Sequence, residues 1–199
     1  MPRTGLNSEE IREKAIDVTL AKMREVGFEK VRLTDIAREL GVSHAALYFH
    51  FKGKSDLLDA VSERWLLKLD ETLQAICRKN ADPCEKIHAW ALEIHRAKVE
   101  KVRNDPELYK AFHMSTAQFK PFVQRHVEVM QKQLLGLVKE AIAKNGLENV
   151  DPEGMTKIII EAGAGFHHPS LVALYIDEKR ENLLHQVTDS VLKGLHLKE

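Results

Sequence analysis

Apolar side chains recur every three or four residues along most of the chain, which is the spacing of one face of an α-helix. Ile11, Ala15 and Val18 follow this spacing near the N-terminus. No segment alternates apolar and polar residues over six positions, so nothing predicts a strand. The pattern predicts an all-α protein of about nine helices. They are expected at residues 8–26, 33–40, 44–50, 55–79, 83–103, 106–118, 121–145, 152–168 and 178–195, with a short further turn after Pro169.

Turn-forming and capping residues mark the ends of several predicted helices. Asn7 and Ser8 precede two glutamates, which suits a helix N-terminus because side-chain oxygens and negative charge both satisfy its exposed N–H groups. An Asp-Pro pair occurs three times, and each pair predicts a capping carboxylate followed by a proline at the first helical position. These pairs are Asp82-Pro83, Asp105-Pro106 and Asp151-Pro152. The glycines predicted to end helices with a positive φ are Gly27, Gly41 and Gly146.

Helix length divides the chain into two parts. The first helices are short and joined by turns of a few residues, whereas the later ones are long enough to form a bundle. We therefore expect one domain at residues 1–54 and a second, helical domain at residues 55–199, with the boundary near Lys54 inside a continuous structure. The length of 199 residues suffices for this arrangement, and neither repeats nor low-complexity tracts interrupt it.

The segment from residue 33 to residue 51 has the spacing of a helix-turn-helix motif, whose second helix enters the major groove of DNA. Gly41 permits a turn with positive φ between two short helices, and Ser43 is placed to cap the second. Apolar residues of both helices recur at helical spacing and are expected to face inward: Ile36, Ala37, Leu40, Val42, Leu47 and Phe51. Many helical hairpins share such a pattern, so these positions alone do not establish DNA binding.

The continuation of the motif is more specific. The stretch LTDIARELGVSHAALYFHFKGKSDLL resembles the N-terminal signature of the TetR family of transcriptional regulators, and the resemblance covers about residues 8–60. It implies a homodimeric DNA-binding regulator, most often a repressor that a small-molecule effector releases from a near-palindromic operator in double-stranded DNA. Beyond residue 60 the resemblance rests on helix number and chain length.

The resemblance implies that particular positions of this chain contact DNA. Residues on the exposed face of the second helix, expected to meet base edges, are His44, Ala45, Ala46 and Tyr48, with Phe49 at its edge. The other DNA-contacting positions are Thr34 on the outer side of the first helix, Ser43 at the cap, and His50, Lys52 and Lys54 at the phosphates. The hydroxyl of Tyr48 is also expected to reach a phosphate. Arg32 departs from the Thr that many family members carry at this position. Its guanidinium cannot cap a helix, so a phosphate contact is expected instead.

The second helix of the motif carries neither Lys nor Arg, although phosphate contacts usually involve cations. Residues 1–54 hold 10 Lys and Arg against 8 Asp and Glu, a difference of +2, while the whole chain has a formal net charge of +0. We therefore expect the cations after the helix to position the protein, and small side chains at its front to let the backbone approach base edges. For each residue taken alone, ordinary packing or surface exposure is the alternative.

The stretch IIIEAGAGFHHPSLVALYI, residues 158–176, is apolar around most of its circumference and contains four small residues that permit close helix packing. A segment of this kind is expected to be buried on all sides. Either it forms the centre of a monomeric bundle, or it contributes to an interface between two chains. The resemblance favours the second alternative, because it implies a homodimer through the last two helices.

Aromatic and histidine side chains are concentrated in the middle helices. The resemblance implies a small-molecule pocket there, whereas aromatic residues at helical spacing more often form ordinary core. The residues predicted to line the pocket are Trp65, Trp90, His95, Phe112, His113, Phe166 and His167.

Other functions have little support in the sequence. His88 and His95 lie seven residues apart, about 10.5 Å along a helix, which is too far for one metal ion. No nucleophile–base pair or phosphate-binding glycine loop is visible, so no metal, cofactor or enzymatic activity is expected. No apolar run reaches the roughly 18–20 residues of a membrane span, no signal peptide is visible, and two cysteines suggest free thiols in the cytoplasm.

Two alternatives to a ligand-controlled repressor remain open at this point. The first is a regulator of the same fold that responds to a protein partner or to no effector. The second is a helical binding module in which the N-terminal motif is structural and does not contact DNA.

Overall fold

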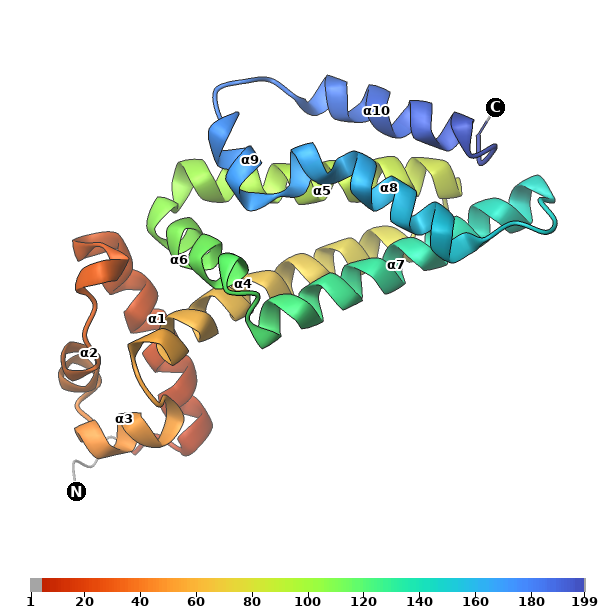
Figure 1. Cartoon of the computed structure of the whole chain (residues 1–199). Coiled ribbons are helices and arrows are strands. Elements are labelled where there is room, and N and C mark those ends of the chain that lie inside the picture. Colours follow the sequence, from red (N-terminus) through yellow and green to blue (C-terminus); the bar gives the residue numbers. More distant parts are fainter. Residues whose placement is uncertain (1–4, 199) are drawn as a thin grey trace. The chain divides into compact units, whose positions relative to one another are not determined.

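The residues described, 5–198, form α-helices and one short 3₁₀ helix, and no strand, in the computed structural model (Figure 1). The all-α prediction is therefore confirmed. The elements are α1 (Ser8–Val26), η1 (Phe28–Lys30), α2 (Leu33–Leu40), α3 (His44–His50), α4 (Lys54–Cys77), α5 (Pro83–Asn104), α6 (Pro106–Ala117), α7 (Pro121–Asn145), α8 (Pro152–His167), α9 (Pro169–Leu174) and α10 (Glu181–Gly194). The predicted helix bounds differ from these by three residues or fewer.

The apolar stretch at residues 158–176 is divided between two helices. α8 ends at His167 and α9 begins at Pro169, which has no N–H group to continue an α-helix. The N–H group of His168 donates to the carbonyl of Ala164 at 2.9 Å and closes α8. The short turn predicted after Pro169 is confirmed as α9.

Two of the predicted N-caps have the expected geometry. Asn7 accepts the N–H group of Glu10 at 2.9 Å, and the Glu10 carboxylate accepts the N–H group of Asn7 at 2.8 Å, which completes a capping box. Asp82 accepts the N–H groups of Cys84 at 2.9 Å and Glu85 at 3.2 Å at the start of α5. All three predicted glycine stops have a positive φ, and Gly41, at φ 66° and ψ 23°, is left-handed.

The cap prediction is wrong for the other two Asp-Pro pairs. Neither Asp105 nor Asp151 makes a side-chain cap hydrogen bond. Asp105 is buried, and both of its carboxylate oxygens accept from the guanidinium of Arg24, at 3.2 and 2.6 Å. A bidentate pair between two charged groups is stronger than a single bond from the carboxylate to a neutral N–H group, which explains why this carboxylate turns away from its own helix.

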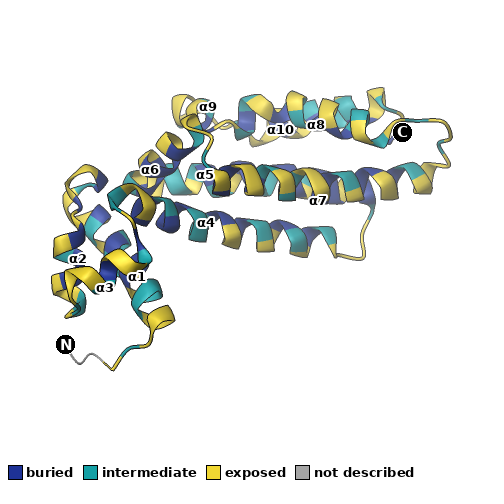
Figure 2. Cartoon of the chain, turned by 60° about the horizontal axis from the view of Figure 1, so that its bottom comes forward, coloured by how far each residue is buried: buried dark blue, intermediate teal, exposed yellow. Residues whose placement is uncertain are grey.

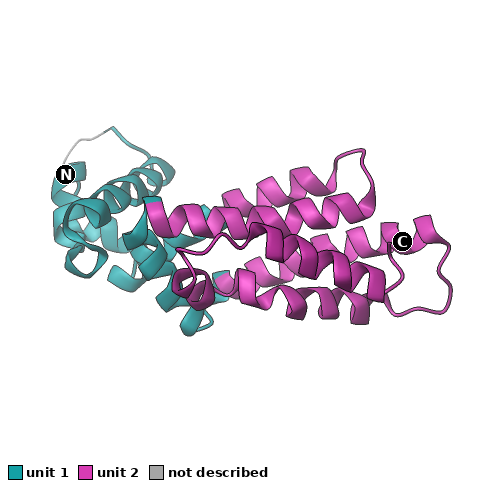
Figure 3. Cartoon of the chain, turned by 90° about the horizontal axis from the view of Figure 1, so that it is seen from above, with its two compact units in different colours: residues 1–66, 104–122 teal, residues 67–103, 123–199 magenta. Residues whose placement is uncertain are grey.

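The chain forms two compact units (Figure 3). Residues 1–66 and 104–122 make up the first, which contains α1, η1, α2, α3, the first half of α4, and α6. Residues 67–103 and 123–199 make up the second, with the rest of α4 and the helices α5 and α7 to α10. The domain boundary expected near Lys54 stays a prediction; the compact unit that holds the helix-turn-helix continues to residue 66.

The core of the first unit holds the helix-turn-helix in place. Ile36 of α2 and Leu47 of α3 are fully buried in it, together with Leu108 of α6. Figure 2 colours the buried positions of the helices dark blue. Full burial of each such side chain contributes roughly 1.5–3 kcal/mol. A polar contact also fastens α6, because the Phe28 N–H group donates to the Glu107 carboxylate at 2.8 Å. The orientation of α3 therefore depends on packing as well as on the turn before it.

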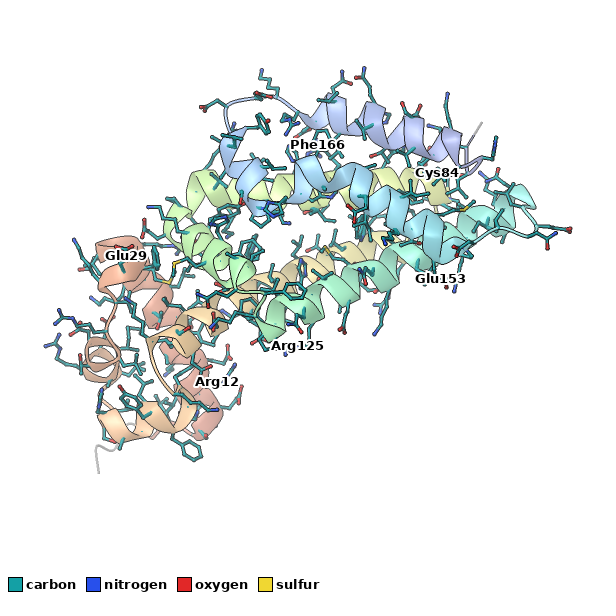
Figure 4. All side chains as sticks on the ribbon, in the orientation of Figure 1. Arg12, Glu29, Cys84, Arg125, Glu153 and Phe166 are labelled. Carbon is teal, nitrogen blue, oxygen red and sulfur yellow. The ribbon has the colours of Figure 1, made fainter. Side chains whose placement is uncertain are left out.

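In the second unit, basic side chains satisfy the last carbonyl groups of α8. Positive charge is favourable at a helix C-terminus, where these carbonyls lack partners within the helix. The pairs are Arg180 Nη1 with the Gly165 carbonyl at 2.9 Å, His95 Nδ1 with the Phe166 carbonyl at 3.0 Å, and Lys98 Nζ with the His167 carbonyl. Arg180 also lies over the ring of Phe166, which Figure 4 labels, with 4.6 Å between the guanidinium carbon and the ring centroid.

Both cysteine thiols are free, as expected, with Cys84 buried and Cys77 half-buried. Every helix within residues 5–198 is too short or too polar to span a lipid bilayer.

Candidate nucleic-acid interface

The turn between α2 and α3 is built by a short set of backbone bonds. The N–H group of Val42 donates to the carbonyl of Ala37 at 3.0 Å, which is possible because Gly41 takes the left-handed conformation between them. Ser43 then accepts the N–H group of Ala46 through its hydroxyl oxygen at 3.1 Å. This cap fixes the start of α3 at His44, and the first residues of the helix, His44 and Ala45, are exposed to solvent.

The two faces of α3 differ in burial. Leu47 is fully buried, while the other predicted DNA-contacting residues of this helix are more open: His44 and Ala45 are exposed, Ala46 is half-buried, Tyr48 is 46% exposed and Phe49 is 82% exposed. The rings of His44 and Tyr48 meet edge to face, with centroids 4.5 Å apart. Tyr48 and Phe49 are adjacent exposed aromatic residues, and a cluster of exposed apolar side chains is more typical of a contact surface than a single one.

The positions predicted to contact phosphate lie at and just after the end of α3. His50 is half-buried, and Lys52 is exposed. The ammonium group of Lys54 donates to the carbonyl of Glu29, which links α4 to η1 within the first unit. An ammonium group has three N–H donors, so this bond leaves donors for a phosphate oxygen. The phosphate contacts themselves stay predictions.

Arg32 occupies the N-cap position of α2 without a side-chain cap bond, as its chemistry requires. It is exposed, as is Thr34. Arg32 lines an open groove of about 700 Å³ together with Lys22, Val26, Glu29, Lys30, Asp35, Arg38 and Glu39. Lys30 is a further candidate for phosphate contact that sequence reasoning missed. Lys30 and Arg32 are both exposed, on either side of buried Val31.

The residues predicted to line an effector pocket fall into two groups, one in each unit. In the first unit, the rings of Trp65 and Phe112 meet edge to face with centroids 4.9 Å apart, and Tyr109 packs beside both. His113 is exposed on α6. This group is an aromatic cluster in which Phe112 and Tyr109 are fully packed.

The second group surrounds the end of α8. Trp90, His95 and Phe166 are buried, and the rings of His95 and Phe166 meet edge to face with centroids 6.1 Å apart. His167 donates through Nε2 to the carbonyl of Ala91 at 2.9 Å. The structure therefore brings four of the seven predicted residues together in the second unit; their contact with an effector stays a prediction.

Burial lowers the pKa of two basic groups of this second cluster, His167 and Lys98. It lowers the pKa of His167 to about 3, helped by the nearby charge of Lys98. It also lowers the pKa of Lys98 to about 8, and Lys98 is itself almost fully buried. Sequence reasoning missed Lys98, although it lies three residues after His95 and therefore on the same face of α5. Within the described part of the chain, no group of three or more His, Cys, Asp or Glu side chains is placed to hold a metal ion.

A chain of polar side chains crosses the second unit between α4, α5 and α7. Trp90 donates through Nε1 to the Gln133 side-chain oxygen at 3.1 Å, and the Gln133 amide donates to the carbonyl of Asp70 at 3.0 Å. The Asp70 carboxylate lies 2.6 Å from Nδ1 of His126. No sequence motif predicts this arrangement, because the two residues of each hydrogen-bonded pair are 43 to 63 positions apart in the sequence.

The last helices retain exposed apolar side chains. Leu184 and Leu192 of α10 face the core, whereas Leu183 is 46% exposed and Ile158 of α8 is 50% exposed. The apolar stretch at 158–176 is thus not buried on all sides within the single chain, as the centre of a monomeric bundle would be, since Ile158 of α8 is exposed.

A family model described as "Tetracyclin repressor-like, C-terminal domain" matches residues 83–188, which is more than half of the chain. The chain belongs to the TetR family. A second model, "Bacterial regulatory proteins, tetR family", matches residues 15–61 and so covers the helix-turn-helix. Members of the TetR family are DNA-binding transcriptional regulators, and this chain is one of them.

Individual relatives agree with this TetR-family assignment. The HTH-type transcriptional regulator SrpR of Pseudomonas putida is 39% identical over 72 residues, 35% of this chain and 34% of SrpR. BetI of Serratia proteamaculans is 29% identical over 135 residues, 55% of this chain and 68% of BetI. A TetR/AcrR-family regulator from Thermobifida fusca shares the fold, with a TM-score of 0.65 at 24% identity over 92% of this chain and 97% of that one. The chain therefore matches about a third of SrpR and about two thirds of BetI.

Proposed function

We propose that this TetR-family chain is a homodimeric transcriptional repressor that a small-molecule effector releases from a near-palindromic operator. The observation that carries the proposal is the exposed face of α3, where Tyr48 and Phe49 project beside two small alanines. Such a face suits the major groove, because small side chains allow close approach and an alanine contacts a thymine methyl group. The match to a repressor-like C-terminal domain favours repression over activation.

The proposed dimer forms through α8 and α10. Their exposed apolar residues, Ile158 and Leu183, support this choice because large apolar side chains favour burial between chains. Two-fold pairing would place two α3 helices about 34 Å apart, one turn of DNA, and so requires an operator with two related half-sites.

The proposed effector acts by a shift between populations of the dimer. A ligand that binds more tightly to a conformation with wrongly spaced recognition helices lowers the affinity for the operator. We expect α4 to carry this change, since residues of α4 belong to both compact units. A cytoplasmic location and the absence of catalytic activity belong to the same proposal.

The test is selection of binding sequences from randomised duplex DNA by the purified protein. We expect enrichment of a near-palindrome; failure to prefer any sequence over random competitor would contradict the proposal.

Tyr48→Ala and Lys54→Ala should weaken binding to all sequences, whereas His44→Ala and Ala45→Ser should change which operator is preferred. Equal loss in both classes of variant would contradict this division of roles. A melting temperature unmoved by any metabolite, with operator binding intact, would favour a regulator without a small-molecule effector.

A further inference from the structure

The second unit contains a buried imidazole in which one nitrogen forms a hydrogen bond and the other does not. His126 of α7 is 4% exposed, and its Nδ1 lies 2.6 Å from a carboxylate oxygen of Asp70 in α4. Its Nε2 atom is closed to solvent and has no hydrogen-bond partner among the residues that the structure describes. Buried polar atoms in proteins are nearly always bonded, so this atom requires an explanation.

Further hydrogen bonds hold the helices that surround this ring. The Asp70 backbone carbonyl accepts from Gln133, which in turn accepts from the indole of Trp90. Both Gln133 and Trp90 are buried. Helices α4, α5 and α7 are therefore joined around the ring, and a rotation that would give Nε2 another partner would break the bond to Asp70.

The bond to Asp70 decides the chemistry of the free nitrogen. A carboxylate accepts hydrogen bonds, so Nδ1 carries the proton and the neutral ring presents a lone pair at Nε2. A hydroxyl group donates to that lone pair, and it accepts from Nε2–H when the ring is charged. A carboxylate ligand satisfies only the charged ring and would add a second negative charge near Asp70.

We infer that His126 is a ligand-binding residue, with Asp70 as its positioning residue, and that the ligand is a small, mostly apolar molecule that bonds to Nε2 through a hydroxyl group. The inference rests on the proposed control by an effector and names the chemical class of that effector. The apolar character follows from the neighbours on the same face of α7, Val123 and Met130, and from buried Trp90 on α5.

The experiment uses phenol as the hydroxyl probe and anisole, its methyl ether, as a probe of similar shape without a donor. We expect saturating phenol to shift the ¹⁵N resonance of His126 Nε2 in the full-length protein, and phenol to bind about tenfold more tightly than anisole. If the Nε2 chemical shift does not change at saturating phenol, the inference is overturned. That result is expected for a site that holds only an ordered water. Equal affinity for the two probes would do the same.

The matched variants are His126→Phe and His88→Phe. Both remove a half-buried or buried histidine whose Nε2 makes no hydrogen bond among the described residues. His88 differs in that its ring stacks on that of His185, with centroids 4.2 Å apart, and its Nε2 lies 3.7 Å from the Asp189 carboxylate. We expect the preference for phenol to disappear in His126→Phe and to persist in His88→Phe; persistence in both would overturn the inference. If His126→Phe does not fold, Asp70→Asn serves, since loss of orientation should change the ring tautomer seen by ¹⁵N NMR and reduce the preference for phenol.

Operator binding separates this inference from the proposed function. If phenol binds at His126 but leaves operator affinity unchanged, the ligand site stands and release by an effector fails. If a compound releases the operator while the His126 resonance stays unchanged, control by an effector stands and the assignment of its site to His126 fails.

Discussion

Buried and half-buried basic residues of the second unit show how the surroundings of a side chain affect its charge. His95, Lys98 and His167 all bond to backbone carbonyls, and the described neighbours provide no carboxylate bonded to any of them. Carbonyls compensate a buried charge only partly, so burial lowers the pKa of both Lys98 and His167. His126 differs from these three, because a carboxylate of the same unit faces its ring.

The lowered pKa of His167 predicts sensitivity of the fold to acid. In the unfolded chain this histidine takes up a proton below about pH 6.5, whereas in the fold it does so only near pH 3. Stability from the neutral ring is therefore present above pH 6.5 and is lost as the pH falls towards 3. We expect His167→Gln, which keeps a donor for the Ala91 carbonyl, to remove about 2–3 kcal/mol of the stability difference between pH 7 and pH 4.5.

Urea unfolding at the two pH values measures this effect. The neighbouring His168→Gln is the control, since His168 is exposed and should leave the pH dependence as in the unmodified protein. The same pH dependence in His167→Gln and in the unmodified protein would show that the buried ring does not cause the loss.

Among the helices, α2 begins without a side-chain cap because Arg32 stands at that position. Arg32→Thr provides a hydroxyl that can accept the Asp35 N–H group, and we expect a gain of about 1 kcal/mol in unfolding free energy. The same change removes a cation next to the proposed phosphate backbone. We therefore expect weaker operator binding with a salt dependence reduced by about one ion.

Thermal unfolding and operator titration at several salt concentrations test the two effects together. Arg38→Thr is the control, because Arg38 lines the same groove from inside α2 and is paired with Asp35 at 2.7 Å. A substituted Arg32 that raised stability without changing the salt dependence would remove Arg32 from the DNA contact.

Helices were predictable because they follow local rules. Periodicity, prolines and glycines set their bounds, and the split of the apolar stretch at Pro169 follows from one missing N–H group. The inner and outer faces of α3 were also legible, since Leu47 and Phe51 recur at helical spacing. The partners of individual side chains could not be predicted in this way. Local rules predicted that Asp105 caps α6, whereas it pairs with Arg24, 81 residues away. The dyad of Asp70 and His126 was missed for the same reason.

For the whole molecule, the exposed apolar residues of α8 and α10 lead to a prediction about assembly. A glutamate within an apolar interface carries an unpaired charge that is costly to bury. We expect Ile158→Glu combined with Leu183→Glu to raise the dimer dissociation constant by at least about a hundredfold and to weaken operator binding, because two half-sites are no longer read together.

Light scattering coupled to size-exclusion chromatography measures the mass of the assembly. Leu67→Glu is the control, because Leu67 is similarly exposed but belongs to α4. A double variant that remained dimeric would move the interface away from these helices. The oligomeric state could not be predicted from the hydrophobic pattern alone. An apolar helix can lie at the centre of a monomeric bundle or at an interface between two chains.

The contact between Cys84 and the end of the chain has a consequence for measurement. The Cys84 thiol lies 2.9 Å from the Leu197 carbonyl, which also accepts from Asn145 at 2.9 Å. Burial raises the pKa of the thiol, so the reactive thiolate is scarce while the segment stays docked. A maleimide or disulfide reagent therefore reacts with Cys84 only when the segment around Leu197 detaches, while half-buried Cys77 provides an internal reference. The ratio of the two labelling rates would measure how often this segment opens, without any engineered probe.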